Sequence, residues 1–538
     1  MNPVTERELV DSYIRRGYWQ DRTLGDFIST RAQAEGDRIA LVDQRDALTY
    51  RELDDAAGRV AGLLAQKGVE KGDRVMLQMK NSVWHVVSFL GIAKAGAIPI
   101  MALCAHRLRE LGSFAERAEP TAFIVNEAHQ GIDYPAMARE VQARFPGMKT
   151  ILTFDDIVRA ARQASPLDAA AIAARRPAFT DIGLLTCSGG STNIPKLIPR
   201  RHADYLYDAE TFAAFLGMNR NDAFMIALPA SHNFVLGNPG ILGTLSVGGT
   251  VVLCENPSPD EILPMIEEHR VTGISLVPAV LSAVLETLSW DDSYDLSSWR
   301  MTLVGGSVLE EQLARKAMLM LPSTLHQVFG TAEGINFCTA ADDPEEVVIA
   351  SQGKAISEAD EWKIVDENLN EVPRGASGEL IARGPYTIQH YYRAPEAEGS
   401  FTDDGFYRTG DRAHVAPNGY LVVEGRITDQ INRGGEKIVP SELEGYLAEL
   451  PSIEEVQVVG VPDELLGQRV CAFAIGGSDG FSPASANSHL ASLGVASHKR
   501  IDQVELIDMW PLTAVGKIDR KRLVEWAQAS RNQTNRQL

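Results

Sequence analysis

The chain has 538 residues, which is too many for one compact core, so several domains or subdomains are expected. Its apolar content of 45% and charged content of 23% are those of a globular protein, and its net charge of −21 argues against general binding to nucleic acid or to an anionic membrane. The cysteines are scattered without a C-x-x-C pair, which argues against a disulfide framework or a zinc site and favours a reducing, cytoplasmic compartment.

At the N-terminus, residues 1–9 combine neither a basic region nor an apolar run, so no signal peptide is expected, and no later apolar stretch predicts a membrane span. Residues 49–67 predict a helix with Thr49 as its cap. Strands are then expected at 73–79, 97–102, 122–125, 150–153, 182–187, 223–228, 250–253 and 273–277, with helices between them. This alternation is typical of an α/β domain of mostly parallel sheets covered by helices.

The pattern changes after Gly353. Residues 378–383 and 419–424 alternate between polar and apolar side chains and predict short antiparallel β structure. Residues 441–444 have the spacing of a capping box, and they predict a helix that runs to about residue 450. Two strands and a last helix after Asp519 complete a small α+β unit. We therefore expect a large domain over 1–427, which includes a β subdomain, and a small C-terminal domain over 428–538.

A strand at 182–187 leads into residues 188–196, whose sequence is SGGSTNIPK. Glycines let backbone N–H groups approach a phosphate, Ser and Thr add hydroxyl donors, and Lys196 adds a positive charge. This composition favours a loop that holds the triphosphate of a nucleotide; the alternative is a flexible surface turn. The Walker A pattern fits poorly, because it needs glycine at the position of Pro195.

Further motifs follow downstream. They are residues 228–234 (LPASHNF), 327–330 (QVFG), 329–334 (FGTAEG), 383–388 (RGPYTI), 406–411 (FYRTGD), 429–437 (DQINRGGEK) and 511–517 (PLTAVGK). Those at 329–334, 407–411 and 511–517 are each weak by themselves, because a lone turn glutamate or a lysine near the terminus is usually solvated, whereas those at 384–387 and 429–437 are far more specific. Together and in this order they resemble the ANL superfamily of adenylate-forming enzymes over essentially the whole chain. The stand-alone aryl-acid adenylating enzymes, of the 2,3-dihydroxybenzoate–AMP ligase type, are the most similar group.

The resemblance implies an α/β fold with a mobile C-terminal domain, and ATP and Mg²⁺ as cofactors. The nucleotide-binding residues that it implies are Ser188, Gly189, Gly190, Ser191, Thr192, Lys196, Gly305, Gly306, Gln327, Val328, Phe329, Gly330, Asp411 and Arg426. The aryl-acid residues that it implies are Asn233, Phe234, Asn238, Gly305, Ser307, Ile335 and Asn336.

Five further roles are implied in the same way. Glu333 would hold Mg²⁺, Thr331 would line the α-phosphate, and Lys517 would bridge the carboxylate substrate and the α-phosphate. His232 would gate a tunnel for a phosphopantetheine arm, and a simple packing histidine is the alternative. Thr428 would be the hinge, although the family usually has Lys or Asp there. No general base is needed, because a carboxylic acid is already ionised near neutral pH.

The chain departs from the family around the aryl acid. Phe234 stands where dihydroxybenzoate enzymes commonly have Tyr and salicylate enzymes commonly have Phe. Asn238 stands where Ser (dihydroxybenzoate) or Cys (salicylate) faces the ring's 3-position. Asn336 occupies a position that is usually apolar in the family. In the phosphate loop, Asn193 stands where the family mostly has glycine. Because buried amides need partners, we expect a 2-substituted benzoate with an added polar group, such as a hydroxy-anthranilate, an amino- or formamido-salicylate, or 2,3-dihydroxybenzoate. Alternatively Asn238 and Asn336 bond to each other or to backbone, and plain salicylate binds.

The resulting hypothesis is an enzyme that makes an aryl-AMP and loads the phosphopantetheine thiol of a separate carrier protein, in the biosynthesis of a siderophore or an aryl-capped natural product. An aryl-CoA ligase is the alternative enzyme, and a catalytically silent binding protein is the alternative of another class. A dinucleotide oxidoreductase is disfavoured, because no strand is followed by G-x-G-x-x-G and a helix. Neither nucleic acid nor a membrane is expected as a partner.

Overall fold

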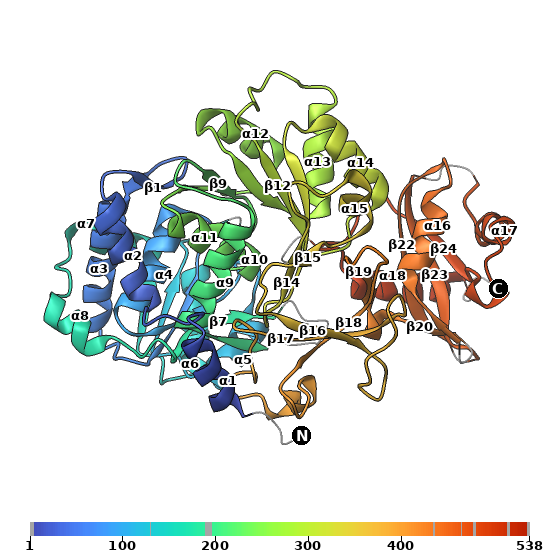
Figure 1. Cartoon of the computed structure of the whole chain (residues 1–538). Helices are drawn as coiled ribbons and strands as arrows, with labels where there is room; N and C mark the ends of the chain where they lie inside the picture. Colours follow the sequence, from blue (N-terminus) through green and yellow to red (C-terminus); the bar gives the residue numbers. More distant parts are fainter. Residues whose placement is uncertain are drawn as a thin grey trace. The chain divides into compact units, whose positions relative to one another are not determined.

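The computed structural model describes residues 5–129, 131–188, 196–433, 436–463, 465–476, 480–513 and 517–534. The chain divides into two compact units, of which the first contains Met1–Trp362 and Ala382–Arg408 and the second Lys363–Ile381 and Thr409–Leu538 (Figure 1). A separate domain over 428–538 stays a prediction.

The first unit contains a six-stranded sheet in the order β6-β5-β3-β4-β7-β8. Its strands are β3 (Arg74–Gln78), β4 (Ile98–Met101), β5 (Ala122–Val125), β6 (Thr150–Thr153), β7 (Ile182–Cys187) and β8 (Leu197–Arg201). Neighbouring strands are parallel except β7 and β8, which are antiparallel. The predicted phosphate loop therefore joins two adjacent strands at one edge of this sheet.

A nine-stranded sheet in the order β15-β14-β13-β12-β11-β9-β10-β1-β2 is the second sheet of this unit. Its strands are β1 (Ile39–Val42), β2 (Ala47–Thr49), β9 (Ala223–Ile226), β10 (Thr250–Leu253), β11 (Gly273–Leu276), β12 (Met301–Gly305), β13 (Thr324–Gly330), β14 (Asn336–Cys338) and β15 (Lys354–Ala355). Its centre is parallel from β1 to β13, and β2, β14 and β15 are antiparallel at the two edges. Because β12 and β13 are parallel, Gly305 and Gly330 both lie at carboxyl ends, where α/β sheets bind ligands.

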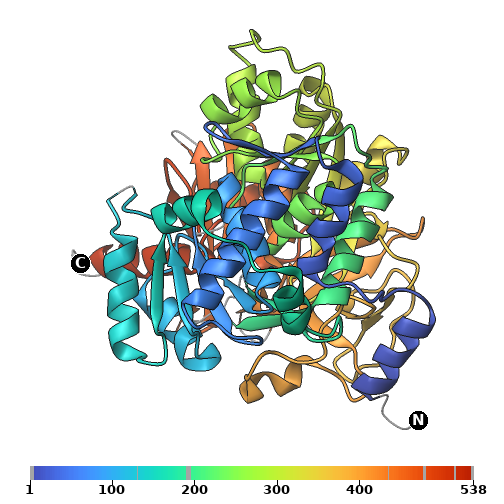
Figure 2. The ribbon, with the colours of Figure 1, turned by 90° about the vertical axis from the view of Figure 1, so that its left-hand side faces the viewer.

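Helices pack against both sheets, and the largest core cluster combines side chains from α2–α4, α9 and α11 with strands of each sheet. The helices of this unit are α1 (Glu6–Arg15), α2 (Leu24–Glu35), α3 (Tyr50–Gln66), α4 (Val83–Lys94), α5 (Leu108–Ala118), α6 (Tyr134–Arg144), α7 (Phe154–Gln163), α8 (Ala169–Arg175), α9 (His202–Phe215), α10 (Asn233–Leu236), α11 (Gly240–Ser246), α12 (Pro259–Glu268), α13 (Pro278–Leu288), α14 (Glu311–Met320), α15 (Glu345–Ala350) and the 3-10 turn η1 (Pro395–Ser400). Figures 1 and 2 show α2, α3 and α4, drawn in blue, side by side.

The predicted cap of α3 is confirmed. Thr49 accepts a hydrogen bond from the backbone N–H of Glu52 at 3.2 Å, and Glu52 accepts one from the backbone of Thr49 at 2.8 Å. Apolar residues at helical spacing then bury one face of the helix, with Leu53, Ala57 and Val60 all fully buried. The predicted α/β class is likewise confirmed by the two mostly parallel sheets.

The second unit contains most of a four-stranded sheet in the order β16-β17-β18-β19 and a smaller sheet in the order β21-β20-β23-β22, with β24 paired to β23. The strands are β16 (Glu361–Val365), β17 (Gly378–Arg383), β18 (Tyr407–Val415), β19 (Leu421–Arg426), β20 (Ile431–Arg433), β21 (Glu436–Ile438), β22 (Ile453–Asp463), β23 (Gly467–Gly476) and β24 (Gln503–Leu506). The helices are α16 (Pro440–Ala448), α17 (Pro483–Ser492), α18 (Arg520–Thr534) and the 3-10 turns η2 (Ile427–Asp429) and η3 (Ser497–Lys499).

The capping box expected at residues 441–444 is wrong. Pro440 takes the first helical position of α16, so Ser441 lies inside the helix and its hydroxyl donates to the carbonyl of Glu424. Glu444 does not reach back to the start of the helix; its Oε1 accepts from the backbone N–H of Val458 at 2.8 Å and from Arg520 at 2.8 Å. The carboxylate thus joins α16 to β22 and α18.

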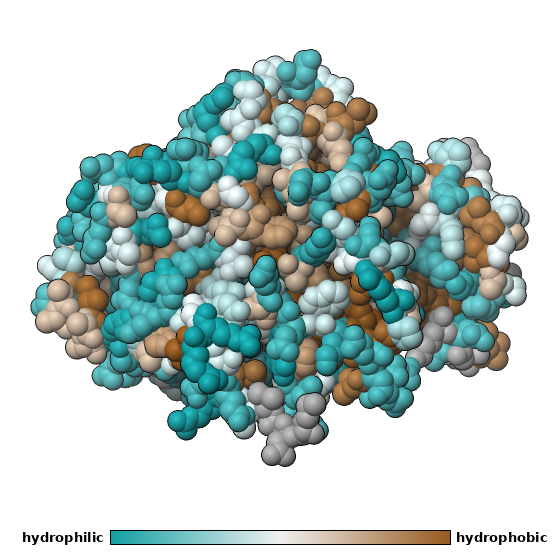
Figure 3. Space-filling model, viewed as in Figure 1, coloured by the Kyte–Doolittle hydropathy of each residue, from teal (hydrophilic) through white to brown (hydrophobic). Residues whose placement is uncertain are grey.

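Hydrophilic side chains cover most of the face shown in Figure 3, in keeping with the high charge of the chain. Among the helices within the described ranges, none is both long enough and apolar enough to cross a bilayer.

Candidate active site

The base of the predicted phosphate loop is closed by two hydrogen bonds. The backbone N–H of Ser188 donates to the carbonyl of Lys196 at 2.9 Å, and the backbone N–H of Lys196 donates to the Ser188 hydroxyl at 2.9 Å. These bonds continue the antiparallel pairing of β7 and β8. Gly189, Gly190, Ser191 and Thr192 lie outside the described residues, so their expected phosphate contacts stay predictions.

Lys196 and Glu333 are joined through Tyr391, although they are far apart in sequence. The ammonium of Lys196 lies 4.4 Å from the centre of the Tyr391 ring, and the Tyr391 hydroxyl donates to Oε1 of Glu333 at 2.7 Å. Tyr391 and Glu333 are both buried. The cation expected at the β- and γ-phosphates and the carboxylate expected at the metal therefore belong to one connected group.

Glu333 suits Mg²⁺ as one ligand among several. No cluster of three or more His, Cys, Asp or Glu side chains able to hold a metal occurs within the described parts of the chain. Mg²⁺ commonly takes only one or two protein carboxylates and completes its shell with phosphate and water oxygens. Oε1 of Glu333 accepts the Tyr391 hydrogen bond, and Oε2 accepts none from a described residue, so an oxygen ligand is available.

Glu333 lies in a tight loop between β13 and β14. The backbone N–H of Thr331 donates to Ile335 at 3.2 Å, and that of Gly334 donates to Thr331 at 3.1 Å. Gly334 and Ile335 have φ values of 110° and 119°, and a Cβ on Gly334 would lie 2.1 Å from the carbonyl of Tyr386. A β-branched residue at positive φ is strained, so the surrounding structure holds this loop in an unfavourable conformation.

Gly305 and Phe234, which are both expected at the aryl acid, lie close together. A Cβ on Gly305 would lie 3.1 Å from the tip of the Phe234 ring and 2.8 Å from the carbonyl of Val328. Glycine at the end of β12 therefore lets Phe234 lie against the β12–β13 edge. Gly306, at a φ of 88°, and Ser307 follow directly and are exposed.

Gln327 was expected at the nucleotide, but its side chain has structural partners. Its amide nitrogen donates to the carbonyls of Val348 at 2.6 Å and Ile349 at 3.0 Å, and its amide oxygen accepts from Gln352 at 3.2 Å. These bonds attach α15 to β13. Any contact of residues 327–330 with a nucleotide would therefore involve the backbone or Phe329, which is half-buried.

His232 and Asn233 begin the short helix α10. Nδ1 of His232 accepts from the backbone N–H of Phe234 at 3.3 Å, which caps the helix and directs the ring. His232 is half-buried and Asn233 is buried. The predicted gating role of His232 is compatible with this exposure and stays a prediction.

Asn238 and Asn336 have a partner that neither expectation included. Both donate to the carboxylate of Asp208, Asn336 at 2.8 Å and Asn238 at 3.3 Å. The oxygen of Asn238 accepts from the Asn233 amide at 3.0 Å, whose own oxygen accepts from the Tyr205 hydroxyl at 2.9 Å. The two amides therefore bond neither to each other nor to backbone, and their main donor contacts are satisfied by an internal carboxylate.

Arg200 connects this carboxylate to the predicted metal loop. It is fully buried and donates to Asp204 at 2.9 Å, to Asp208 at 3.1 Å and to the carbonyl of Ala332 at 3.2 Å. Burial disfavours its charge, but Asp204 and Asp208 outweigh that effect and raise the pKa of Arg200 above its ordinary value. Arg200, Tyr205, Asp208 and Tyr391 were not predicted; only the charges spaced four residues apart at 200, 204 and 208 signalled any of them.

Asp411 and Arg426 meet in the second unit, as the expected ribose grip requires. They are directly opposite in the antiparallel pair of β18 and β19, and Nε of Arg426 lies 3.0 Å from Oδ1 of Asp411. Arg426 also donates to the carbonyl of Thr409 at 2.7 Å, and the Thr409 hydroxyl accepts from the backbone of Asp411 at 3.0 Å.

Thr428 and Lys517 also belong to the second unit. Thr428 is exposed in the 3-10 turn η2, which directly follows β19. Lys517 closes a turn: its carbonyl accepts from the backbone of Thr513 at 2.6 Å, and its backbone N–H donates to the Thr513 hydroxyl at 3.1 Å. Residues 514–516, within this turn, lie outside the described residues.

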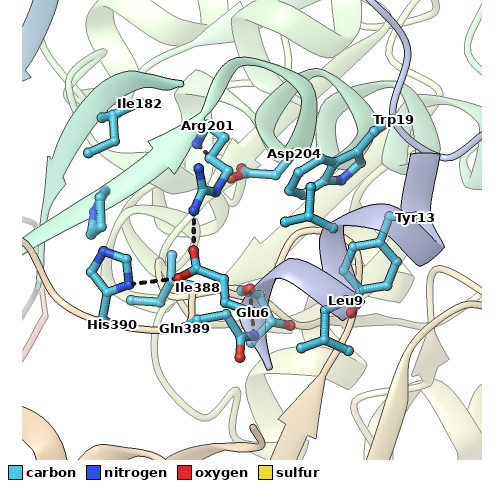
Figure 4. Close-up of a pocket in the computed structure, with 13 residues that line it drawn as sticks. Glu6, Leu9, Tyr13, Trp19, Ile182, Arg201, Asp204, Ile388, Gln389 and His390 are labelled. Carbon is cyan, nitrogen blue, oxygen red and sulfur yellow. Dashed lines mark hydrogen bonds and ion pairs between the residues drawn. The ribbon is translucent and has the colours of Figure 1, made fainter. Parts of the chain in front are cut away.

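A surface pocket of about 100 Å³ lies elsewhere in the first unit, between α1 and residues 387–390 (Figure 4). Glu6, which lines it, forms ion pairs with Arg201 and, at 3.8 Å, with His390. Asp204, the partner of Arg200, also lines it. None of the residues predicted for the nucleotide or the aryl acid contributes to this pocket, so it is not the expected active site.

Comparison with known proteins identifies the family. The AMP-binding enzyme family matches residues 28–392, and the C-terminal domain of AMP-binding enzymes matches residues 442–517. Among solved structures, apo MbtA of Mycobacterium smegmatis has a TM-score of 0.74 and 39% sequence identity, with 98% of each chain covered.

Three curated relatives match over nearly their whole length. The 2,3-dihydroxybenzoate-AMP ligase of Bacillus subtilis is 39% identical over 96% of each chain. A salicylyl-CoA synthase / salicylate adenylyltransferase of a Streptomyces species is 40% identical over 96% of each chain. The salicyl-AMP ligase / salicyl-S-ArCP synthetase of Mycobacterium tuberculosis is 40% identical over 95% of this chain and 92% of the relative. The chain therefore belongs to the AMP-binding enzymes, the ANL superfamily of adenylate-forming enzymes, as its motifs predicted.

Proposed function

We propose that this protein activates a 2-substituted benzoate with ATP to give aryl-AMP and pyrophosphate, and then transfers the aryl group to the phosphopantetheine thiol of a separate carrier protein. The observation that carries the proposal is the connected group of Lys196, Tyr391 and Glu333, which combines a cation and a carboxylate next to the phosphate-loop base. The names of the relatives support an aryl acid as the substrate.

In the first step an oxygen of the aryl carboxylate attacks the α-phosphorus, the bond to the β-phosphate oxygen breaks, and pyrophosphate leaves. Glu333 would hold Mg²⁺, which would supply charge neutralisation for the phosphate groups. Lys196 would attract the β- and γ-phosphates, and Lys517 would offset charge at the attacking carboxylate and the α-phosphate. Asp411 and Arg426 would fix the ribose, and the buried amide of Asn233 would orient the aryl acid.

In the second step the thiol attacks the carbonyl carbon of the aryl-AMP, and AMP leaves. We place His232 at the entrance used by the phosphopantetheine arm, because it is half-exposed and directly precedes Asn233. Thr428 would be the hinge about which residues 428–538 rotate between the steps; its exposed position between β19 and β20 supports this assignment.

The product would enter a siderophore or a related aryl-capped peptide. The five free cysteines suit a reducing cytoplasm.

Exchange of labelled pyrophosphate into ATP tests the first step. Wild-type enzyme should show exchange that depends on an aryl acid, and Lys517→Ala should lower its rate on the order of 10²–10³-fold, because a pre-placed charge is lost. Transfer from chemically prepared aryl-AMP to the thiol should continue in this variant. Lys521→Ala, which removes an exposed lysine in α18, is the matched control and should leave exchange unchanged.

The second candidate is an aryl-CoA ligase, and the Streptomyces relative whose name includes salicylyl-CoA synthase favours it. Comparing coenzyme A with a phosphopantetheinylated aryl carrier protein as acceptors separates the two. We expect a much higher kcat/KM with the carrier, and a higher value with coenzyme A would replace our proposal. ATP binding without exchange for any aryl acid would indicate a catalytically silent binding protein.

A further inference from the structure

The fully buried carboxylate of Asp208 contacts two of the residues expected at the aryl acid, Asn238 and Asn336, and the resemblance to the family assigned it no role. Asp208 stands on α9 one helical turn after Asp204, so both carboxylates face the buried guanidinium of Arg200. One cation therefore faces two carboxylates. The amide N–H groups of Asn238 and Asn336 are the other hydrogen-bond donors to Asp208 among the described residues.

An ionised carboxylate accepts hydrogen bonds and donates none. The nitrogen of each amide must therefore face Asp208, and the oxygen must face away from it. For Asn238 the oxygen then meets the amide of Asn233 at 3.0 Å. Without Asp208 the amide of Asn336 would be free to turn by 180°, because its nitrogen and oxygen have nearly the same size, whereas Asn233 would still hold the oxygen of Asn238.

The oxygen of Asn336 has a different environment. It accepts no hydrogen bond from any residue within the described ranges, although the residue is only 2% exposed. Asn336 stands opposite Gly330 in the pair of β13 and β14, and a Cβ on Gly330 would lie 2.2 Å from this oxygen. The oxygen therefore occupies the space that the glycine leaves empty at the carboxyl end of β13.

We propose that Asp208 is a specificity-determining positioning residue. By holding the nitrogens of Asn238 and Asn336, it presents the oxygen of Asn336 as a fixed acceptor. This acceptor selects aryl acids that carry a hydrogen-bond donor, an amino or hydroxyl group, in addition to the 2-substituent. This inference rests on the proposed function and narrows its substrate class. An aryl acid without a donor at this position leaves the Asn336 oxygen unpaired. An aryl acid with only an acceptor there places two partially negative atoms next to each other.

The charge of Asp208 supplies an independent readout. Burial raises the pKa of Asp208 to about 6, and Arg200 opposes the rise. The other titratable groups around it are Asp204 and Tyr205 on α9, and Tyr386 and Asp360. The Tyr386 hydroxyl accepts a hydrogen bond from the backbone N–H of Asn336 and donates one to Asp360. Protonation would turn one oxygen of Asp208 into a donor and release an amide, so selectivity for donor-bearing acids should fall as the pH drops below about 6.

The experiment compares three probes in pyrophosphate exchange: 2-hydroxybenzoate, 3-amino-2-hydroxybenzoate and 3-methoxy-2-hydroxybenzoate. For wild-type enzyme near pH 7.5 we expect kcat/KM for the amino acid to exceed that for the methoxy acid by about 10- to 100-fold. Asp208→Asn should bring this ratio close to one, through KM of the aryl acid, while KM of ATP is unchanged. Asn336→Leu should also remove the preference.

Asp222→Asn is the matched control, because Asp222 is another buried carboxylate of the first unit, paired with Arg300 at 2.7 Å and outside this network. It should keep the wild-type ratio. Should Asp208→Asn fail to fold, wild-type enzyme alone still tests the inference, since its ratio must decline between pH 7.5 and about pH 5.

An equal ratio in wild type and Asp208→Asn, or a wild-type ratio near one at every pH, would overturn the assignment of Asp208 and leave aryl-acid adenylation standing. Wild-type exchange with none of the three acids would instead overturn the proposed function, and the inference with it.

Discussion

At the scale of single residues, polar side chains in this protein are connected across large distances in sequence. Tyr391 joins the expected phosphate loop to Glu333, and Arg200 joins the metal loop to Asp208. Each of these residues is buried and joins two segments that carry residues predicted for the site. Buried polar groups of this kind are costly unless they are fully paired, so removing a linking residue, Tyr391 or Arg200, should affect both of the segments that it joins.

Tyr391→Phe should weaken the response of the enzyme to magnesium. Without the hydroxyl, Glu333 loses its orienting hydrogen bond, and loss of such an outer partner typically costs about 10- to 100-fold in metal affinity. Exchange rates measured as a function of magnesium concentration should show this shift, with KM of the aryl acid unaffected. Tyr392→Phe is the control, and an unchanged magnesium dependence in Tyr391→Phe would contradict the role assigned to Tyr391.

Asp360 should make the protein less stable as the pH rises. Burial raises the pKa of Asp360 to about 8, while the Tyr386 hydroxyl, which donates to it at 2.5 Å, opposes the rise. Between about pH 4 and about pH 8 the folded chain keeps a proton that the unfolded chain has released, so the free energy of unfolding falls through this window. Denaturant unfolding at several pH values should show a smaller decline for Asp360→Asn than for wild type; identical slopes would refute the prediction.

At the scale of elements, the positions of the strand ends were more predictable than their side-chain contacts. Alternating strands and helices predicted parallel sheets, and parallel sheets bring Gly305 and Gly330 to one edge. The loop that follows β13 has a strained conformation that no local pattern indicated, because the strain depends on Tyr386, a residue far along the chain.

Gly334→Ala should test how closely this loop is packed. The new Cβ would lie 2.1 Å from the carbonyl of Tyr386 at a φ of 110°, so we expect more than about 2 kcal/mol of destabilisation and a raised KM for ATP. Gly217→Ala is the control, since Gly217 has a φ of 63° and nothing within 4 Å of its Cβ position. It isolates the backbone cost, which is about 1 kcal/mol. Equal losses of stability in the two variants would mean that the loop shifts to accommodate the new Cβ of Gly334→Ala.

The predicted capping box at residues 441–444 failed for a similar reason. Its spacing was correct, but Pro440 started the helix two positions earlier than a cap at Ser441 would, and tertiary partners engaged both Ser441 and Glu444. Asp208 illustrates the same limit among the residues near the expected aryl-acid site. The departures at Asn238 and Asn336 were visible in the sequence, and their common partner was not, because it stands on a helix that precedes both. Family membership, by contrast, followed from the motifs and their order along the chain.

At the scale of the whole molecule, the expected residues fall into both compact units. The phosphate-loop base, Glu333 and the aryl-acid residues belong to the first unit, while Asp411, Thr428 and Lys517 belong to the second. A reaction that uses both sets requires them to meet around one nucleotide at least once in each cycle. The proposed rotation of residues 428–538 would provide this meeting for Lys517 and would end it for the second step.

Thr428→Pro should separate the two steps. A fixed φ at the expected hinge would hinder rotation, so we expect carrier loading to fall at least about tenfold while pyrophosphate exchange stays within about twofold of wild type. Single-turnover transfer to the carrier measures the first effect. Thr428→Ala removes only the hydroxyl and should retain both activities. A proline variant that loads the carrier at the normal rate would exclude Thr428 as the hinge.

The path of the chain between the two units limits how the enzyme can be re-engineered. Because residues 363–381 belong to the second unit and 382–408 return to the first, the polypeptide passes from one to the other three times. The crossing points fall inside β16, β17 and β18, so a single cut at any of them would sever a strand. A hybrid that grafts the second unit onto another member of the family must therefore exchange two separate stretches of gene together, and one fusion junction at residue 362 or 408 should yield insoluble protein.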